Sequence, residues 1–481
     1  MSHLDERVLE ARLEALERAR AWSPRVISKL EALLRAADDA QLFRVNPITF
    51  ATERHVEESE AIDLFLHAAR AELFTMEWQL ICPQCTDAVE TLGALDAIGS
   101  AFHCDLCRTD LATCLDDLIQ VTFTITPTLR RLRYHDPESL PIEEYCFGYH
   151  FSTGSRFSDG RPLAEGIRPF VALLAYVEAG QTGRCAAELH PGRVNGADRV
   201  SRAEIGLSVA GAPSTVPTTV RLRLEGGRFS CDATTVPPGP AVFEIENATS
   251  RRAAVCAVNM GPGHQPGRAQ LPPFLSGKRL FVTHTFSELF RSQTVGKHGG
   301  LALREITLLF TDLKGSTELY ERIGDLRAFH LVDQHFDRLG EVVRRHHGAV
   351  VKTIGDAVMA TFARPAEALA SAIEMLRSIE AFNRERGARD VILKIGLHSG
   401  PSIAVTLNER LDYFGQAVNI AARVQGLAEG DDICLTDPVR SAPGVAELLA
   451  GLQVTSREAH LRGIERPLQV HRARALSHLA P

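Results

Sequence analysis

The chain has 481 residues, 45% hydrophobic and 23% charged, which is enough for about two to four domains with ordinary buried cores. Its formal net charge of −7 gives no global electrostatic reason to bind nucleic acid or an anionic membrane, and we expect neither as a partner. No run of about 18 apolar residues occurs, and the charged N-terminal stretch lacks the apolar core of a secretory signal. We therefore expect a cytoplasmic protein whose ten cysteines are thiols or metal ligands rather than disulfides.

The first three segments of the chain differ in pattern. Residues 1–75 carry apolar side chains at helical spacing and are predicted to be a helical region. Residues 76–117 contain four paired cysteines, and residues 118–295 contain short apolar or alternating runs between Gly- and Pro-rich turns. This last pattern, which begins with the run Ile119–Ile125, is typical of a β sandwich or barrel. With no second catalytic set of residues there, residues 118–295 are interpreted as a regulatory domain.

The paired cysteines have the spacing of a metal site. Cys82 and Cys85 form one C-x-x-C pair, Cys104 and Cys107 form the next, and 18 residues separate the two pairs. Two such pairs can bring four thiolates into the tetrahedron of one structural Zn²⁺ ion, as in a zinc ribbon. Two redox pairs or simple buried thiols are the alternatives. The segment lacks a basic and aromatic stripe, so a role in holding the fold is favoured over nucleic-acid binding.

Residues 301–475 have the order of a ferredoxin-like unit. A buried strand ending at Asp312 precedes a helix predicted over 317–346, with Phe329, Val332, Phe336, Leu339 and Val343 on one face. The later predicted elements are, in chain order, two strands around an Ile-Gly-Asp turn, a helix over 365–386, a strand over 391–400, a helix over 416–427 and a strand over 432–436. The β-α-β-β-α-β order predicts a multidomain α+β protein with a ferredoxin-like C-terminal domain.

Two carboxylates are candidates for a metal site in this domain. Asp312 ends the first strand and Asp356 occupies the hairpin turn, so both can reach one sheet edge, where Mg²⁺ could bind between them. Capping of the next helix by Asp312 and turn formation by Asp356 are the alternatives. Between them, Gly315, Ser316 and Thr317 lead into a helix whose N–H groups could hold a phosphate.

Three segments, FTDLKGST, VKTIGDAVMATF and FGQAVNIAARV, resemble in order and spacing the class III adenylyl/guanylyl cyclase catalytic domain. The resemblance covers residues 301–475. It implies that Asp312 and Asp356 hold two Mg²⁺ or Mn²⁺ ions per active site. It also implies that Asn419 orients the ribose and that Arg423 stabilises the charge developing on the α-phosphate. Asn419 and Arg423 are four residues apart and share one helix face, although Arg423 could instead be a surface charge.

The resemblance also implies a preference for ATP. Lys352 matches the lysine that donates to adenine N1, and Asp412 matches the acceptor of the adenine amino group, whereas glutamate and cysteine are implied for GTP. The segment RLDYFGQ is shorter than the form common in bacterial relatives. Counting back from Gly415 puts Asp412 at the base-reading position and keeps the distance to Asn419, whereas counting forward from Leu411 would leave that position deleted. Arg462 falls where the family usually has a phosphate-binding lysine. A solvated strand lysine is the alternative for Lys352.

The implied reaction converts ATP to 3′,5′-cyclic AMP and pyrophosphate at a homodimer interface. A guanylate or relaxed-specificity cyclase and a catalytically silent nucleotide-binding module are the alternatives. The first 295 residues resemble an uncharacterised N-terminal domain joined to bacterial cyclase domains, which implies control of the activity by this region.

Overall fold

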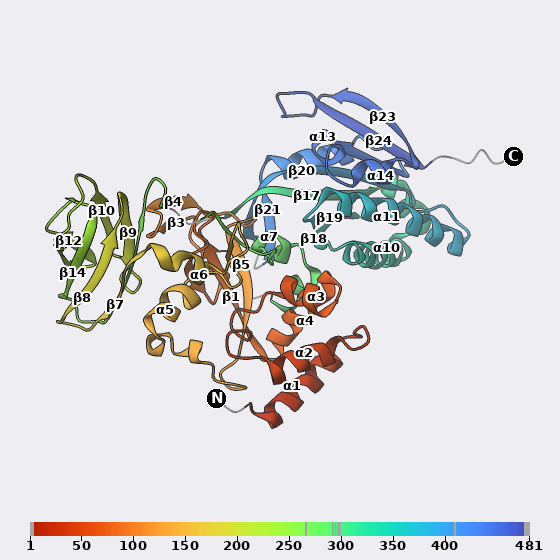
Figure 1. Ribbon diagram of the computed structural model, residues 1–481. Coiled ribbons are helices and arrows are strands. Elements are labelled where there is room, and N and C mark those ends of the chain that lie inside the picture. Colours follow the sequence, from red (N-terminus) through yellow and green to blue (C-terminus); the bar gives the residue numbers. More distant parts are fainter. Residues whose placement is uncertain are drawn as a thin grey trace. The chain divides into compact units, whose positions relative to one another are not determined.

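The computed structural model describes residues 4–264, 267–290, 293, 295, 300–407 and 410–475. The chain forms two compact units (Figure 1). The first holds the chain up to Gly93 together with Ala101–Thr113 and Leu118–Leu275. The second holds Ala94–Ser100, Cys114–Asp117 and the chain from Ser276 onward. The predicted helical, cysteine-rich and β-rich segments thus all contribute to the first unit.

The first unit begins with four helices and a small antiparallel sheet. Asp5 caps the first helix by accepting a hydrogen bond from Val8 N at 3.1 Å, and Leu9, Leu13 and Leu16 of that helix are buried. The helices are α1 (Glu6–Ala19), α2 (Val26–Ala36), α3 (Pro47–Arg54) and α4 (Glu58–Arg70). The sheet has the order β2-β1-β5, with β1 (Phe74–Ile81), β2 (Ala88–Leu92) and β5 (Ile119–Ile125). The run at 119–125, predicted as part of the β-rich domain, therefore belongs to this earlier sheet, where all seven of its residues are buried.

The rest of the first unit is a β sandwich and its connections. Sheets of order β13-β10-β9-β15-β7 and β12-β11-β14-β8 share one core, which includes Leu207, Val220, Phe243 and Val255. The strands are β7 (Val171–Val177), β8 (Thr182–Leu189), β9 (Gly192–Asp198), β10 (Glu204–Val209), β11 (Thr218–Glu225), β12 (Arg228–Cys231), β13 (Thr235–Val236), β14 (Gly239–Asn247) and β15 (Ala253–Met260). The connections contain the hairpin β3 (Ala101–Cys104) and β4 (Thr109–Ala112), α5 (Ile142–Glu144), the π-helical turn η4 (Tyr145–Tyr149), β6 (Arg156–Phe157), α6 (Leu163–Ile167) and β16 (Ala269–Gln270).

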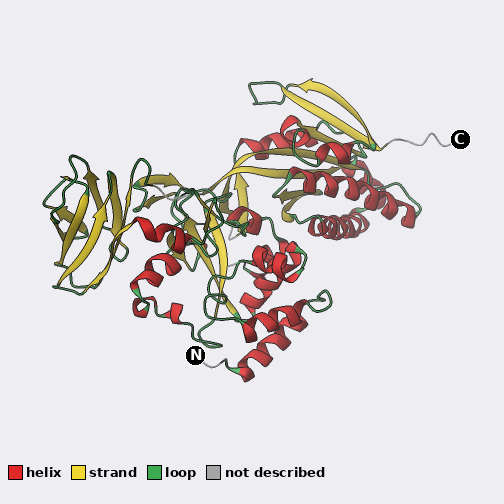
Figure 2. Cartoon of the chain, viewed as in Figure 1, coloured by secondary structure: helices red, strands yellow, loops and turns green. Residues whose placement is uncertain are grey.

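The second unit is built on one large sheet, whose strands are yellow in Figure 2. Its strand order is β18-β19-β17-β20-β22-β24-β23, with β21 paired to β20. The first four strands in chain order form the predicted ferredoxin-like arrangement. The strands are β17 (Leu301–Leu313), β18 (Ala349–Ile354), β19 (Ala357–Phe362), β20 (Leu393–Leu407), β21 (Arg410–Phe414), β22 (Asp432–Thr436), β23 (Leu452–Ala459) and β24 (Leu468–Ala475). The helices are α7 (Gly277–Phe281), α8 (His284–Leu289), α9 (Ser316–Ile323), α10 (Asp325–Arg345), α11 (Pro365–Arg386), α12 (Gln416–Gln425), α13 (Asp437–Arg440) and α14 (Val445–Leu449).

The helix predicted over 317–346 is two helices, because Gly324 between α9 and α10 adopts a φ of 81° that ends the first. On α10, Leu339 and Val343 are buried and Val332 and Phe336 are partly buried, as predicted. Phe329 is 65% exposed and does not face the core. The prediction was therefore wrong for Phe329.

Helices cover both faces of this sheet. Leu339 of α10, Leu369 of α11 and Leu435 of β22 belong to one core cluster. Val424 of α12 and Cys434 of β22 belong to another. Successive side chains of a strand point to opposite faces, so α12 packs on the face opposite to α10 and α11.

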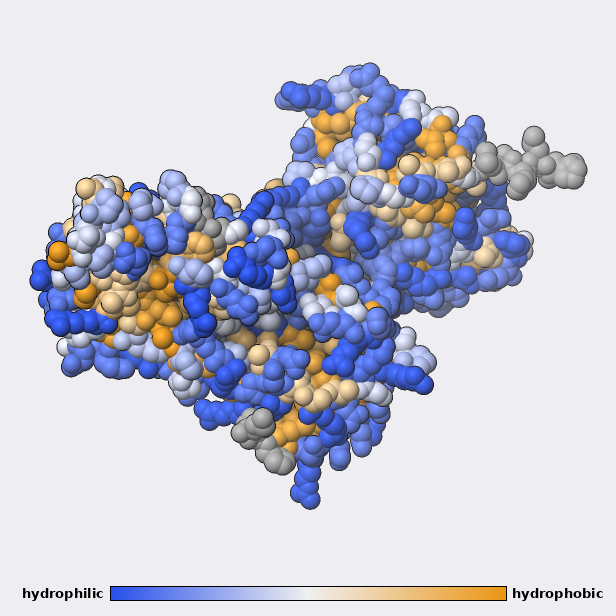
Figure 3. Space-filling model, in the orientation of Figure 1, coloured by the Kyte–Doolittle hydropathy of each residue, from blue (hydrophilic) through white to orange (hydrophobic). Residues whose placement is uncertain are grey.

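The segment Cys114–Asp117 is tied to the first strand of the second unit. Leu115 N donates to Ala302 O at 2.9 Å. The Asp116 carboxylate accepts from Arg304 N at 2.7 Å and from Lys278 Nζ at 2.9 Å. Among the described residues, no helix is long and apolar enough to cross a membrane. Figure 3 shows that hydrophilic residues predominate on the drawn surface, with hydrophobic patches between them.

Candidate functional site

Asp312 and Asp356 lie at the same end of the sheet in the second unit. Antiparallel pairing of β17 with β19 sets Phe310 opposite Met359, and Val358 N donates to Thr311 Oγ1 at 3.0 Å just beyond that pair. Continuing this register places Asp312 opposite the first residue of β19, which directly follows Asp356. The two predicted metal ligands therefore come from neighbouring strand ends.

The surroundings of these carboxylates suit a cation. Burial raises the pKa of Tyr320 on α9, and the negative charges of Asp356 and Asp312 raise it further. Asp356 Oδ2 is buried and has no hydrogen-bond partner among the described residues. Within the described part of the chain, Asp312 has one weak ion pair, to Lys394 Nζ at 3.5 Å. A buried carboxylate oxygen without a partner is costly, and a divalent ion with oxygen ligands would satisfy it.

The loop after Asp312 presents an open helix N-terminus. Gly315 precedes α9 with a φ of 71°, a left-handed conformation that glycine adopts without strain. No side chain caps the helix, whose first residues are Ser316 and Thr317. Its first backbone N–H groups are therefore available to a phosphate.

The two predicted base-reading residues are in direct contact. Lys352 on β18 forms an ion pair with Asp412 on β21. The Lys352 side chain is 41% exposed, whereas that of Asp412 is 10% exposed. Asp412 Oδ1 also accepts a hydrogen bond from Tyr413 N at 2.8 Å, which fixes the carboxylate. A donor and an acceptor thus stand side by side at one position.

Asn419 and Arg423 lie on α12, with Asn419 exposed and Arg423 partly buried. A Cβ added at Gly463 would lie 3.5 Å from Arg423 Nη2, so the Arg423 guanidinium lies beside the loop that also carries the exposed Arg462. Among the described residues no acidic side chain pairs with Arg423. Two cationic side chains are therefore free to meet an anion here.

Tyr320 and Lys394 were not predicted as part of the site. Lys394 lies directly opposite Asp312 in the pairing of β17 with β20. Tyr320 lies on the second turn of α9. The pairing of two strands that are far apart in sequence places Lys394 beside Asp312, and no sequence pattern indicated this contact. The position of Tyr320 four residues after Ser316 could have suggested that it points along the same helix face.

The four predicted cysteine ligands form a cluster in the first unit. Their sulfur atoms all lie within 4.8 Å of one another. Cys82 Sγ lies 3.8 Å from Cys107 Sγ, and Cys85 Sγ lies 3.7 Å from Cys104 Sγ. Hydrogen bonds from the other three thiols, that of Cys104 foremost, hold the pKa of Cys82 well below its usual value. This cluster could hold a metal ion.

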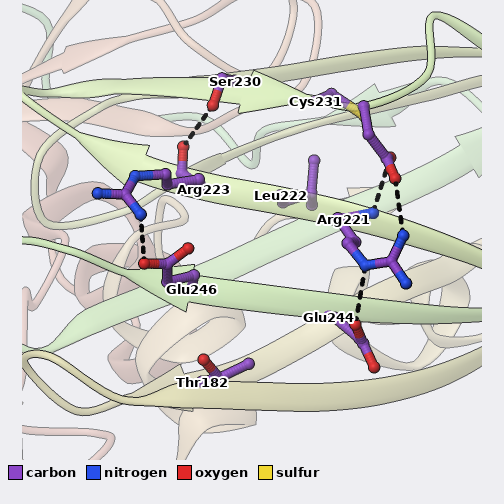
Figure 4. Close-up of a pocket in the computed structure, with 9 residues that line it drawn as sticks. Thr182, Arg221, Leu222, Arg223, Ser230, Cys231, Glu244 and Glu246 are labelled. Carbon is purple, nitrogen blue, oxygen red and sulfur yellow. Dashed lines mark hydrogen bonds and ion pairs between the residues drawn. The ribbon is translucent and has the colours of Figure 1, made fainter.

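A second feature of the first unit is a charged trough of about 410 Å³ on the sandwich (Figure 4). Arg221 Nε forms an ion pair with Glu244 Oε2 at 3.3 Å, and Arg223 forms an ion pair with Glu246. The charges are already matched across β11 and β14. The trough therefore offers a ligand no unpaired arginine.

Two family models match the chain. The Family of unknown function (DUF5939) matches residues 8–288. The Adenylate and Guanylate cyclase catalytic domain matches residues 302–462. The predicted resemblance of the C-terminal segment to that catalytic domain is confirmed.

Curated relatives match part of the chain. An adenylate cyclase of Anabaena cylindrica is 27% identical over 43% of this chain and 44% of its own. Adenylate cyclase 2 of Rhizobium meliloti is 31% identical over 32% of this chain and 46% of its own. The chain thus spans less than half the length of either relative. The crystal structure of the guanylyl cyclase Cya2 aligns at 20% identity and a TM-score of 0.33, over 38% of this chain and 96% of that one.

Proposed function

Because the chain belongs to the family of unknown function DUF5939, and because a cyclase catalytic domain follows that region, we propose that it is an adenylate cyclase under N-terminal control. The proposed reaction converts ATP to 3′,5′-cyclic AMP and pyrophosphate. The observation that carries the proposal is the pair Asp312 and Asp356 at one sheet end, with Asp356 Oδ2 buried and unpartnered. The adenylate cyclase names of the relatives support the choice of nucleotide.

Asp312 and Asp356 would hold two Mg²⁺ or Mn²⁺ ions. When bound, these ions would lower the pKa of the ribose 3′ hydroxyl and neutralise the phosphate charge. The first N–H groups of α9, from Ser316 and Thr317, would bind a phosphate at the positive end of the helix. The 3′ oxygen would then attack the α-phosphorus as the bond to the β-phosphate oxygen breaks.

Arg423 would stabilise the charge that develops on the α-phosphate, and Asn419 would orient the ribose. Arg423 is suited to this role because its guanidinium has no acidic partner among the described residues and lies on a rigid helix. Arg462, exposed beside it, would add charge at the triphosphate. Lys352 would donate to adenine N1, and Asp412 would accept from the adenine amino group.

We infer that the active enzyme is a homodimer in which one chain supplies the aspartates and its partner supplies Asn419 and Arg423. Six of the seven exposed large hydrophobic side chains among the described residues belong to the second unit. They are Leu326, Phe329, Ile354, Ile403, Leu407 and Phe414. Such exposure is typical of surfaces that pair with another protein.

The cysteine cluster is proposed to hold one structural Zn²⁺. Four sulfurs at about 2.3 Å from a tetrahedral zinc lie roughly 3.8 Å from one another. The Cys82–Cys107 and Cys85–Cys104 separations of 3.8 and 3.7 Å fit this geometry. Residues 76–117 would then be a zinc ribbon between the helical region at 1–75 and the β-rich region at 118–295, ahead of the catalytic domain at 301–475.

The direct test is to incubate the purified full chain with Mn²⁺ and either ATP or GTP and to measure cyclic product by chromatography. Cyclic AMP from ATP, abolished in Asp356→Ala, is the expected result. Product from GTP alone would contradict the assignment of Lys352 and Asp412. Nucleotide binding without turnover would favour a silent nucleotide-binding module.

A further inference from the structure

The first unit contains an apolar cavity of about 280 Å³ that the proposed catalytic function does not use. It lies among η4, α6, β15 and the two cysteine pairs. Its apolar lining includes Phe147, Phe151, Phe157, Leu163, Val258 and Met260. Small-molecule sites in proteins are concave and mostly apolar, with a few polar groups that fix the orientation of the ligand.

Side chains on one face of strand β15 form one wall of the cavity. Val255 and Ala257 point into the core of the sandwich. Cys256, Val258 and Met260 line the cavity, which Ala257 also borders. Because successive side chains alternate, the strand gives one face to the sandwich core and the other to the cavity. The unbranched Met260 side chain can adapt to the shape of an occupant.

Aromatic rings form the other walls. The ring centroids of Phe147 and Phe151 are 6.1 Å apart. A Cβ added at Gly166 would collide with the Phe157 ring, so the glycine allows that ring to lie against α6. Phe147 itself belongs to the π-helical turn η4, an irregular helix type that is found often at functional sites.

The rim of the cavity is polar and carries one cation. Arg268 and Gln84 line it and are exposed, and the cavity lining includes no acidic side chain. Among the described residues, no carboxylate forms an ion pair with Arg268. This contrasts with the arginines of the charged trough in Figure 4, which are already paired with glutamates. An apolar chamber with a free guanidinium at its mouth matches an amphipathic anion.

We propose that this cavity binds a small monocarboxylic acid with an apolar body. The apolar body packs among the phenylalanine rings, and the carboxylate accepts two hydrogen bonds from Arg268. A volume of 280 Å³ equals the share of about nine water molecules, so the apolar body has on the order of ten non-hydrogen atoms, the size of a medium-chain fatty acid. The proposal concerns binding and does not depend on the proposed cyclase activity.

The test is calorimetric titration of the zinc-loaded full chain with sodium decanoate below its micellar concentration, and with 1-decanol as an uncharged match. We expect saturable decanoate binding at one site per chain and weaker decanol binding. Arg268→Gln should weaken decanoate binding about tenfold or more, because a charge-assisted hydrogen-bond pair is lost. Arg228→Gln, an exposed arginine on β12, is the matched control and should leave the affinity unchanged.

Val258→Trp fills the cavity and should abolish decanoate binding while the melting temperature stays at or above that of the parent chain. If that variant does not fold, the Arg268 and Arg228 pair decides the outcome, because both side chains are exposed. Equal affinity for decanoate and decanol would overturn the proposal. So would an equal loss in Arg228→Gln, or no saturable binding of decanoate up to millimolar concentration.

Discussion

Lys352 of β18 forms an ion pair with Asp412 of β21, so the two side chains proposed to read the base satisfy one another. Adenine would have to insert between a donor and an acceptor that already satisfy one another. Binding of the correct base replaces one set of hydrogen bonds with another. An incorrect base leaves both groups without partners.

The nucleotide preference should therefore reverse when donor and acceptor are exchanged. In the double variant Lys352→Glu and Asp412→Cys, we expect the ratio of GTP to ATP turnover to rise about 100-fold, since each mismatch costs about 1–3 kcal/mol. The measurement is kcat/KM for both nucleotides under the same Mn²⁺ concentration. Arg228→Glu, an exposed charge reversal on the sandwich, should leave the ratio unchanged.

Shared active sites predict complementation between two inactive chains. Asp312→Ala and Arg423→Ala should each lose nearly all activity. After mixing in equal amounts, half of the dimers pair unlike chains and carry one intact site each, so activity should recover to about a quarter of the parent value. Cyclic AMP production before and after mixing measures this. Mixtures that stay inactive although the chains exchange would argue against sites shared between subunits.

Metal removal should destabilise the first unit. We expect one zinc per parent chain by elemental analysis, and none in Cys104→Ser. Loss of a structural zinc removes several kcal/mol of folding free energy, which should lower the melting temperature by roughly 10 °C. Cys231→Ser is the control, because Cys231 is exposed on β12 and outside the cluster. Full zinc content in Cys104→Ser would refute the four-cysteine assignment.

His398 should make the stability of the second unit depend on pH. Burial in β20 lowers the pKa of His398 to about 4, and its Nδ1 lies 2.8 Å from Thr436 Oγ1. Between the unfolded pKa of about 6.5 and pH 4, the unfolded chain binds a proton that the folded chain does not. The stabilising effect of the neutral ring is thus complete above pH 6.5 and falls by up to about 3 kcal/mol as the pH drops toward 4.

His398→Asn should flatten this decline. The measurement is the denaturation midpoint between pH 7 and pH 4, followed for the parent, His398→Asn and His330→Asn. His330 is exposed on α10 and should behave as the parent does. An unchanged slope in His398→Asn would show that other groups control the acid sensitivity.

Local patterns predicted the elements of the second unit well because its helices and hairpin depend on nearby residues. The helix predicted over 365–386 is observed as Pro365–Arg386, and the hairpin turns at Gly355 with a φ of 63°. The break at Gly324 was missed because a glycine inside an apolar helical pattern is often tolerated. Phe329 fits the helical period and is nevertheless exposed. Periodicity indicates which side chains share a helix face, but it does not determine whether each of them is buried.

Sequence patterns did not predict which distant segments of the chain are in contact. The strand at 119–125 pairs with β1 instead of joining the sandwich, because strand partners depend on the whole chain. Lys394 meets Asp312 through the register of β17 and β20. The cavity beside η4 depends on which face of β15 points outward. By contrast, the cysteine pairs came together as predicted, because their spacing alone identified all four members of the cluster.

The attachment of Asp116 to Arg304 N and Lys278 means that residues 301–475 are not structurally self-contained. A fragment that begins at Leu301 would lack Asp116, whose carboxylate accepts a hydrogen bond from Arg304 N in the first strand. Exchange of the N-terminal halves between relatives would also remove this contact. Recombination at this junction should yield chimaeras that work only when the donor brings its own matching Leu115 and Asp116.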